Sequence, residues 1–143
     1  MSDTIKEFRN EYFFLSNFYI KPFFYNGNKY LTVEHAFQAA KTVNKADHDK
    51  IMNCKTPLIA KQLGRKIKLV EGWDEIKNSI MLDILRCKFN DSVLKKWLIK
   101  TGDKEIQEGN FWGDKYWGVC LKTREGKNVL GKLLMKIRDE VKM

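Results

Sequence analysis

The chain has 143 residues, of which 43% are hydrophobic, which is typical of one packed domain. No apolar run reaches the roughly 20 residues that a bilayer-spanning helix needs, and the N-terminus lacks the apolar stretch of a signal peptide. We therefore expect a cytoplasmic protein with a single domain over residues 1–143. The net charge of +9 favours anionic partners such as phosphates, nucleotides or nucleic acid, although solvated lysine-rich faces are the ordinary alternative.

The cysteines and histidines argue against a metal centre. Cys54, Cys87 and Cys120 are odd in number and far apart, and only two histidines, His35 and His48, are present. A disulfide framework or a cysteine zinc site is therefore not expected, and the thiols are interpreted as buried and unreactive.

Aromatic residues dominate the segment from Phe8 to Tyr19. Asn26-Gly27 between aromatic flanks predicts an antiparallel hairpin near residues 19–31, because both turn residues tolerate positive φ. Thr32 is suited to cap a helix that runs through about residue 41. A second helix is expected over residues 46–53. A third begins at Thr56-Pro57 and stops at Gly64.

The second half of the chain is predicted to be mainly helical. Asp74 is suited to cap the longest helix, about residues 75–88, with an apolar stripe that includes Ile76, Ile80 and Ile84. Asp91 or Ser92 begins a short helix that Gly102 ends. Residues 105–121 read as irregular strand and loop, and a final helix covers residues 128–142. The expected class is α+β, predominantly helical with a small antiparallel sheet.

The helix after Thr32 carries a polar stripe. At about 100° per residue, Glu34, Gln38 and Lys41 fall within about 60° of one another, separate from an apolar ridge. The stripe combines an acid, an amide and an amine, and Glu34 lies in the first turn, where the helix dipole favours negative charge. It is interpreted either as a reactive site or as the solvated face of a surface helix. His35 lies off the stripe and is more typical of a structural histidine.

A second concentration of chemistry spans residues 108–118, with aromatics, two carboxylates, an amide and three glycines. Trp112 and Trp117 are suited either to stack on a heterocycle or to fill the core. Asp114 is interpreted as a turn-former or a catalytic acid. Earlier in the chain, Ser16-Asn17 between apolar residues is suited to bind a ligand or to end a strand.

Several enzyme classes lack their sequence signatures. The chain contains no GxGxxG and no P-loop, so the sequence gives no support to a Rossmann-type dinucleotide-binding or a kinase function. The GxSxG of an α/β-hydrolase and the HExxH of a zinc hydrolase are also absent from the sequence.

The order of these motifs resembles the NADAR family, which is named for NAD and ADP-ribose. The resemblance covers about residues 8–138, and its segments are residues 15–18, 32–41, 72–74, 81, 88–89, 101–103, 108–110, 112–114, 117–118 and 126–135. Each segment alone is weak, but together and in order they are specific. The resemblance implies a helical α+β domain without a metal or an organic cofactor.

Members of this family split N-glycosidic bonds. One branch removes ribose phosphate from pyrimidine intermediates of the riboflavin pathway, and another removes ADP-ribose from the guanine amino group in nucleic acid. The resemblance implies a pocket that contains Glu34, Lys41, Trp73, Lys88, Trp112, Asp114, Trp117 and Asn128. No membrane association is expected, no obligate protein partner is evident, and the choice of substrate stays open.

Cleavage of a C1'–N bond builds positive charge on the ribose and negative charge on the departing nitrogen. Glu34 and Asp114 are the candidate carboxylates that stabilise the cation and protonate the leaving group. Lys41, with Lys88 in reserve, is the candidate for a Schiff base to C1'. The candidates for substrate binding are Arg9, Ser16, Asn17, Phe18, His35, Gln38, Trp73, Asn110, Trp112, Trp117 and Asn128.

Two other functions remain open. A non-catalytic module that binds ADP-ribose or NAD-derived nucleotides would use the same aromatic and basic groups without needing both carboxylates. A plain nucleic-acid-binding protein would show steep salt dependence and no sensitivity to Glu34.

Overall fold

The structure is a computed structural model that describes residues 3–142, and it divides into two compact units. One unit holds the described residues up to Ser16 and those from Asn90 onward, and the other spans Asn17–Phe89. The sequence predicted one domain over the whole chain. Each unit has its own set of buried apolar side chains.

The Asn17–Phe89 unit combines a hairpin with four helices. The predicted Asn26-Gly27 turn is confirmed, with φ of 50° and 80°, and Phe23 pairs with Tyr30 across the antiparallel strands. Its elements are β2 (Phe23–Tyr25), β3 (Asn28–Tyr30), α1 (Val33–Ala39), α2 (Lys45–Met52), α3 (Pro57–Gly64) and α4 (Trp73–Lys88).

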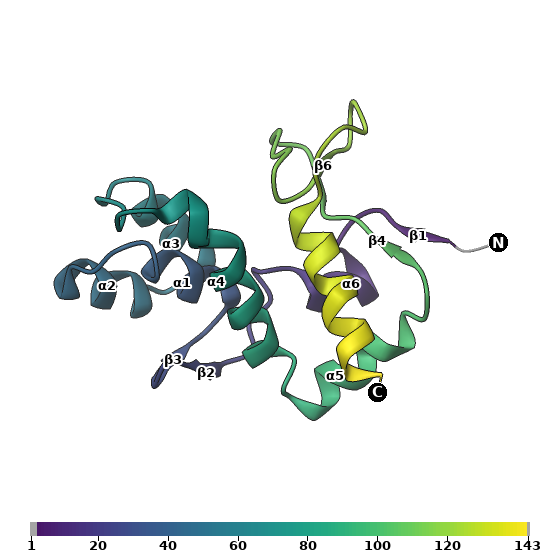
Figure 1. The fold of residues 1–143 in the computed structure, drawn as a ribbon, viewed down its shortest axis with the longest axis horizontal. Coiled ribbons are helices and arrows are strands. Elements are labelled where there is room, and N and C mark those ends of the chain that lie inside the picture. Colours follow the sequence, from purple (N-terminus) through teal and green to yellow (C-terminus); the bar gives the residue numbers. More distant parts are fainter. Residues whose placement is uncertain (1–2, 143) are drawn as a thin grey trace. The chain divides into compact units, whose positions relative to one another are not determined.

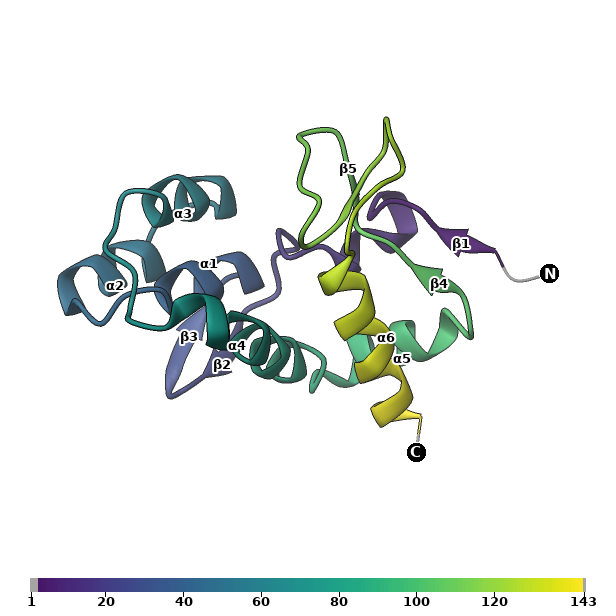
Figure 2. The same ribbon diagram turned by 45° about the horizontal axis from the view of Figure 1, so that its top comes forward.

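Helix α1 is the centre of this unit. It packs against α2, α3 and α4, which lie around it in both ribbon views (Figures 1 and 2). All seven of its residues are buried, including Glu34, His35 and Gln38. The solvated surface helix is therefore excluded as an interpretation of the polar stripe.

The helix starts in this unit follow local capping chemistry. The side chains of Thr32, Asn44 and Thr56 accept the backbone N–H three residues ahead at 3.1, 2.9 and 3.1 Å. Helix α4 begins at Trp73 behind Gly72, earlier than the predicted cap at Asp74. Its predicted apolar stripe is only partly buried, because Ile76 is exposed.

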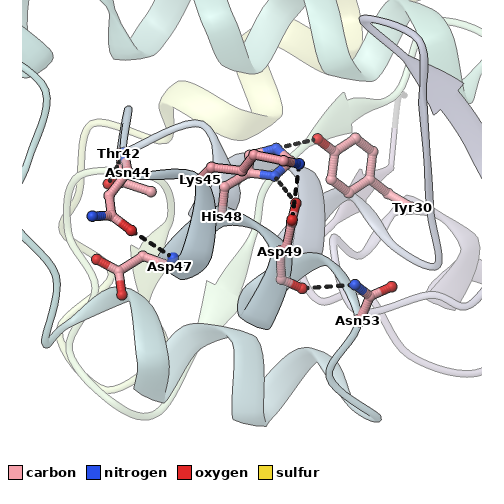
Figure 3. A network of polar contacts seen from close by, with 8 residues as sticks. All are labelled: Tyr30, Thr42, Asn44, Lys45, Asp47, His48, Asp49 and Asn53. Carbon is pink, nitrogen blue, oxygen red and sulfur yellow. Dashed lines mark hydrogen bonds and ion pairs between the residues drawn. The ribbon is translucent and has the colours of Figure 1, made fainter.

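A polar network fastens α2 to the hairpin (Figure 3). The hydroxyl of Tyr30 lies 2.9 Å from Nε2 of His48, and Nδ1 of His48 lies 3.2 Å from Asp49. Lys45 also donates to the Asp49 carboxylate at 3.0 Å. These contacts lower the pKa of Asp49, chiefly through the hydrogen bonds from Lys45 and His48. His48 therefore has a structural role, because it links α2 to Tyr30 of β3.

The other unit contains two parallel strand pairs that the sequence did not predict. β1 pairs with β4 in the register Thr4 to Glu105, and β5 pairs with β6 in the register Gly109 to Val119. The α+β class is confirmed, with one antiparallel hairpin and these two parallel pairs. The elements are β1 (Thr4–Ile5), the 3-10 helix η1 (Asn10–Leu15), α5 (Ser92–Lys100), β4 (Glu105–Ile106), β5 (Gly109–Asn110), β6 (Val119–Cys120) and α6 (Val129–Val141).

Helix α6 packs on α5 and on β4 (Figure 1). Leu130, Leu134 and Ile137 are buried along it, at the helical spacing that the sequence predicted. The segments that follow β5 and β6 extend from this strand pair as two loops (Figure 2). Within residues 3–142, no helix has the length and apolar character needed to cross a membrane.

Candidate active site

Glu34 is a buried carboxylate in the first turn of α1. It is only 8% exposed, and its backbone N–H donates to the carbonyl of Asn17 at 3.1 Å. This bond satisfies one of the N–H groups that a helix start leaves without an intrahelical acceptor. The chain before the hairpin thereby fixes the residue that carries the acid. A carboxylate held in the first turn also interacts favourably with the helix dipole.

The amide of Gln38 holds the Glu34 carboxylate from one turn further along α1. Its Nε2 donates to Oε2 of Glu34 at 2.6 Å, and Gln38 is 5% exposed. This bond fixes the orientation of the amide. An ionised carboxylate only accepts hydrogen bonds, so the amide must turn its nitrogen, and not its oxygen, toward Glu34. The opposite amide atom, Oε1, is buried and has no hydrogen-bond partner in the described part of the chain. A buried unpaired acceptor costs about 1–3 kcal/mol of folding stability. The Gln38 amide therefore holds the Glu34 carboxylate at some cost to the stability of the fold.

Lys41 interacts electrostatically with the same carboxylate. It lies just beyond the helix, because α1 ends at Ala39 and not at about residue 41 as predicted. Burial lowers the pKa of Lys41, and the neighbouring Arg65, Lys77 and Lys61 lower it further, while Glu34 opposes them. The Lys41 carbonyl accepts the backbone N–H of Val70 at 2.7 Å, which anchors the turn after the helix. Helix and turn together therefore keep acid, amide and amine in one cluster.

Two aromatic rings border this cluster. The Phe37 and Trp73 ring centroids are 5.2 Å apart, and Nζ of Lys41 lies 5.8 Å from the Phe37 centroid. Trp73 is buried. Its contact with Phe37 therefore supports the helix that carries Glu34, and the sequence did not predict this contact.

Lys88, the reserve lysine, is buried in the last turn of α4. It is 2% exposed, and its Nζ lies 5.7 Å from the Tyr19 ring centroid and 5.2 Å from that of Phe89. Burial lowers its pKa to about 7. At neutral pH a large fraction of this amine is therefore unprotonated, which is the form that a nucleophile needs.

His35 has both ring nitrogens engaged by the protein. Nε2 lies 3.0 Å from the carbonyl of Cys54, and Nδ1 lies 2.8 Å from the Thr32 hydroxyl. A carbonyl only accepts, so Nε2 carries the proton and Nδ1 accepts from Thr32. Burial lowers the pKa of His35, in agreement with a neutral ring. The geometry favours the structural alternative for this residue over contact with a substrate.

In the other unit, Asn110 and Asp114 build the loop after β5. The Asn110 amide donates to the Asp114 carbonyl and accepts the Asp114 N–H, both at 2.9 Å. Oδ1 of Asp114 accepts the backbone N–H groups of Tyr116 at 3.0 Å and Trp117 at 2.9 Å. Asp114 therefore acts as a turn-former, one of its two predicted alternatives.

The two tryptophans of this loop differ in exposure. Trp112 is 65% exposed, so it is not a core residue, whereas Trp117 is partly buried with its ring centroid 5.0 Å from that of Tyr116 in an edge-to-face contact. The exposure of Trp112 leaves stacking on a heterocycle as its predicted role. Trp117 has part of its surface committed to the loop.

Asn128 holds the start of α6. Its amide accepts the Glu108 N–H at 3.0 Å and donates to the Ile106 carbonyl at 2.8 Å, with a φ of 53°. Asparagine tolerates this left-handed backbone better than most residues. Both ends of the amide are therefore used to hold the 106–108 segment.

The remaining candidates come from the segment of residues 9–18. Arg9 is exposed and forms an ion pair with Glu7 at 3.5 Å, and the N–H of Ser16 closes η1 on Phe13 at 2.9 Å. The Asn17 amide donates to the Met81 sulfur at 3.8 Å, and Phe18 is partly buried. Ser16 ends a 3-10 helix rather than a strand.

No group of three or more His, Cys, Asp or Glu side chains is placed to hold a metal ion within residues 3–142.

Comparison with known proteins decides the family. The model of the NADAR domain matches residues 5–142. The chain belongs to the NADAR family. This confirms the resemblance that the sequence motifs indicated, and it extends over nearly the whole chain.

Several relatives of this chain are named as N-glycosidases. It is 33% identical to N-glycosidase YbiA of Escherichia coli (strain K12), covering 99% of this chain and 91% of that protein. It is 38% identical to N-glycosidase Npun_R5314 of Nostoc punctiforme, with 78% and 74% covered. Riboflavin biosynthesis protein VVA0006 of Vibrio vulnificus is 31% identical over 90% of this chain, which spans 35% of that larger protein.

The fold agrees with a solved structure. The NMR structure of the E. coli protein YbiA matches with a TM-score of 0.87 at 33% identity, covering 99% of this chain and 87% of that chain. The relatives' names support the predicted enzyme class, a hydrolase that acts on N-glycosyl bonds.

Proposed function

We propose that this NADAR protein hydrolyses the C1'–N bond of a ribosylated base, with Glu34 as the central catalytic group. The observation that carries the proposal is the buried Glu34 carboxylate, held by Gln38 at 2.6 Å and electrostatically coupled to Lys41. A carboxylate removed from water acts more strongly on a developing positive charge than one at the surface.

Glu34 stabilises the oxocarbenium-like ribose as the C1'–N bond lengthens. Because Gln38 fixes one carboxylate oxygen in advance, little reorganisation is needed when the charge develops. The leaving nitrogen takes up a proton as it departs. Water then adds to C1' and yields the free sugar.

Lys41 supplies the second route. When the sugar is linked through an exocyclic amine, ring opening gives an imine at C1'. The neutral amine of Lys41 adds to this carbon, the base amine leaves with a proton, and water hydrolyses the resulting lysine imine. Burial and neighbouring cations lower the pKa of Lys41, which increases the neutral fraction that this route requires. Lys88 is the reserve for the same role.

The loop of residues 108–118 is assigned to binding. Trp112 is the candidate that stacks on the base, because its ring is exposed. Asp114 is proposed to contribute mainly by fixing the shape of this loop, since its Oδ1 accepts two backbone N–H groups there. Arg9 and Ser16 remain candidates for ribose hydroxyls or phosphate.

Two substrate classes fit this chemistry, namely a ribosylamino-pyrimidine phosphate and ADP-ribose on the guanine amino group of nucleic acid. Arg65, Lys77 and Lys61 are each close enough to Lys41 to lower its pKa, and this concentration of positive charge supports a substrate with phosphate groups. Hydrolysis of both substrates in one assay, with the released base and sugar quantified, tests the proposal. Release from one of them supports it.

The non-catalytic alternative makes a different prediction. A module that only binds ADP-ribose would give a calorimetric signal with ADP-ribose and release neither product. That combination would replace the glycosidase proposal with the binding module.

A further inference from the structure

We propose that Gly64 of α3 is a positioning residue: its missing side chain leaves the space in which the Gln38 amide holds the Glu34 carboxylate. The kinetic part of this inference rests on the proposed function of Glu34. The contact itself is independent of any activity.

The space above Gly64 is filled by Gln38. A Cβ built on Gly64 would overlap Oε1 of Gln38, and it would lie 2.7 Å from Cδ and 3.3 Å from Cβ of the same side chain. Real Cβ atoms essentially never approach another atom to less than 3.0 Å, so any larger residue here must displace the Gln38 amide. The nearest atoms are those at the end of a flexible side chain. Displacement is therefore easier than disruption of the helix pair.

The backbone of Gly64 does not itself require glycine. The sequence predicted Gly64 as the stop of the third helix, and helix ends commonly depend on a glycine in a left-handed conformation. In the structure α3 does end at Gly64, but Gly64 is not among the residues with positive φ, and Arg65 follows as a right-handed cap with a φ of −76°. Glycine in a helix is less favourable than alanine. The close approach to Gln38 explains its presence instead.

The position of the Gln38 amide depends on its bond to Glu34. Gln38 and Gly64 are both buried where α1 packs on α3. Oε1 faces Gly64 without a hydrogen-bond partner in the described part of the chain, so the bond from Nε2 to Glu34 is the one that fixes the amide. A methyl group on residue 64 pushes the amide away from this position. Glu34 then loses a donor while keeping its place on α1.

The test is a set of variants measured in the full-length protein. Gly64→Ala is expected to lower kcat about tenfold or more with KM changed less than about twofold, since an interaction made in the transition state is lost. Gln38→Ala is expected to show the same loss. Adding Gly64→Ala to Gln38→Ala should lower kcat less than about twofold further, because the residues act through one contact. Gln62→Ala, an exposed change on the same helix, is the control that keeps the wild-type kcat.

A spectroscopic measurement accompanies the kinetics. The side-chain amide resonances of Gln38, identified by their loss in Gln38→Ala, should move in Gly64→Ala and stay in place in Gln62→Ala. If they do not move, or if the two kcat losses are additive, the inference is wrong. A wild-type protein without glycosidase activity refutes the proposed function alone, because the resonances still test the contact. Gln38→Ala with wild-type kcat overturns the positioning role.

Discussion

Replacing Lys88 by methionine should stabilise the protein at neutral pH. Burial lowers the pKa of Lys88 from 10.5 to about 7, and the side chain is 2% exposed. One pKa unit corresponds to about 1.4 kcal/mol, so the neutral form is favoured by about 5 kcal/mol relative to a solvated lysine. Methionine does not pay for desolvation, but it loses the other contacts of the ammonium group. We therefore expect a gain of about 2–5 kcal/mol at pH 7.

The sign of the pH dependence follows from the lowered pKa. Between about pH 7 and 10.5 the unfolded chain binds the Lys88 proton and the folded chain does not, so this residue makes wild-type stability rise with pH. Urea unfolding at pH 7 and pH 10 should show a large advantage of Lys88→Met at pH 7 and a small one at pH 10. Lys50→Met, at an exposed position on α2, is the matched control. An equal advantage at both pH values, or none at pH 7, would refute the reasoning.

Three further predictions concern the amine and the scaffold. Cyanoborohydride added during turnover should leave a sugar adduct on the wild-type chain and none on Lys41→Arg, as mass spectrometry of peptides would show; an adduct elsewhere rules out Lys41 as the nucleophile. Asn128→Ala should lower the free energy of unfolding by about 2–4 kcal/mol, because Glu108 and Ile106 lose their buried partners, and a loss below about 0.5 kcal/mol in urea would contradict this. Thr32→Ala should cost about 1–2 kcal/mol through the lost helix cap and the His35 contact, and an unchanged thermal midpoint would disprove it.

Local chemistry made most helix starts and the hairpin predictable. Thr32 and Thr56 cap helices through their own side chains, and Asn26-Gly27 provides the positive φ values of the turn. Such signals lie within a few residues of the structure that they specify. The parallel pairs of Thr4 with Glu105 and of Gly109 with Val119 lay beyond this reasoning. The first joins segments about a hundred residues apart, and both have only two residues per strand.

The candidate site was predictable as a set of residues but not as an arrangement. Spacing placed Glu34 and Gln38 on one side of a helix, yet the same spacing describes a solvated face. Only the packing of α2, α3 and α4 around α1 buries them. Asp114 likewise had two interpretations from the sequence, a turn-former or a catalytic acid. Its bonds to the N–H groups of Tyr116 and Trp117 were needed to identify the turn.

The most direct test of the account is the turnover of Glu34→Gln beside Glu71→Gln, an exposed control. Glutamine keeps the size of the side chain but removes the negative charge that opposes the ribose cation. We predict that Glu34→Gln retains the thermal midpoint and substrate affinity while kcat falls by about 100-fold or more, and that Glu71→Gln is unchanged. A Glu34→Gln variant with near-normal kcat would contradict the assignment of Glu34 as the central catalytic group.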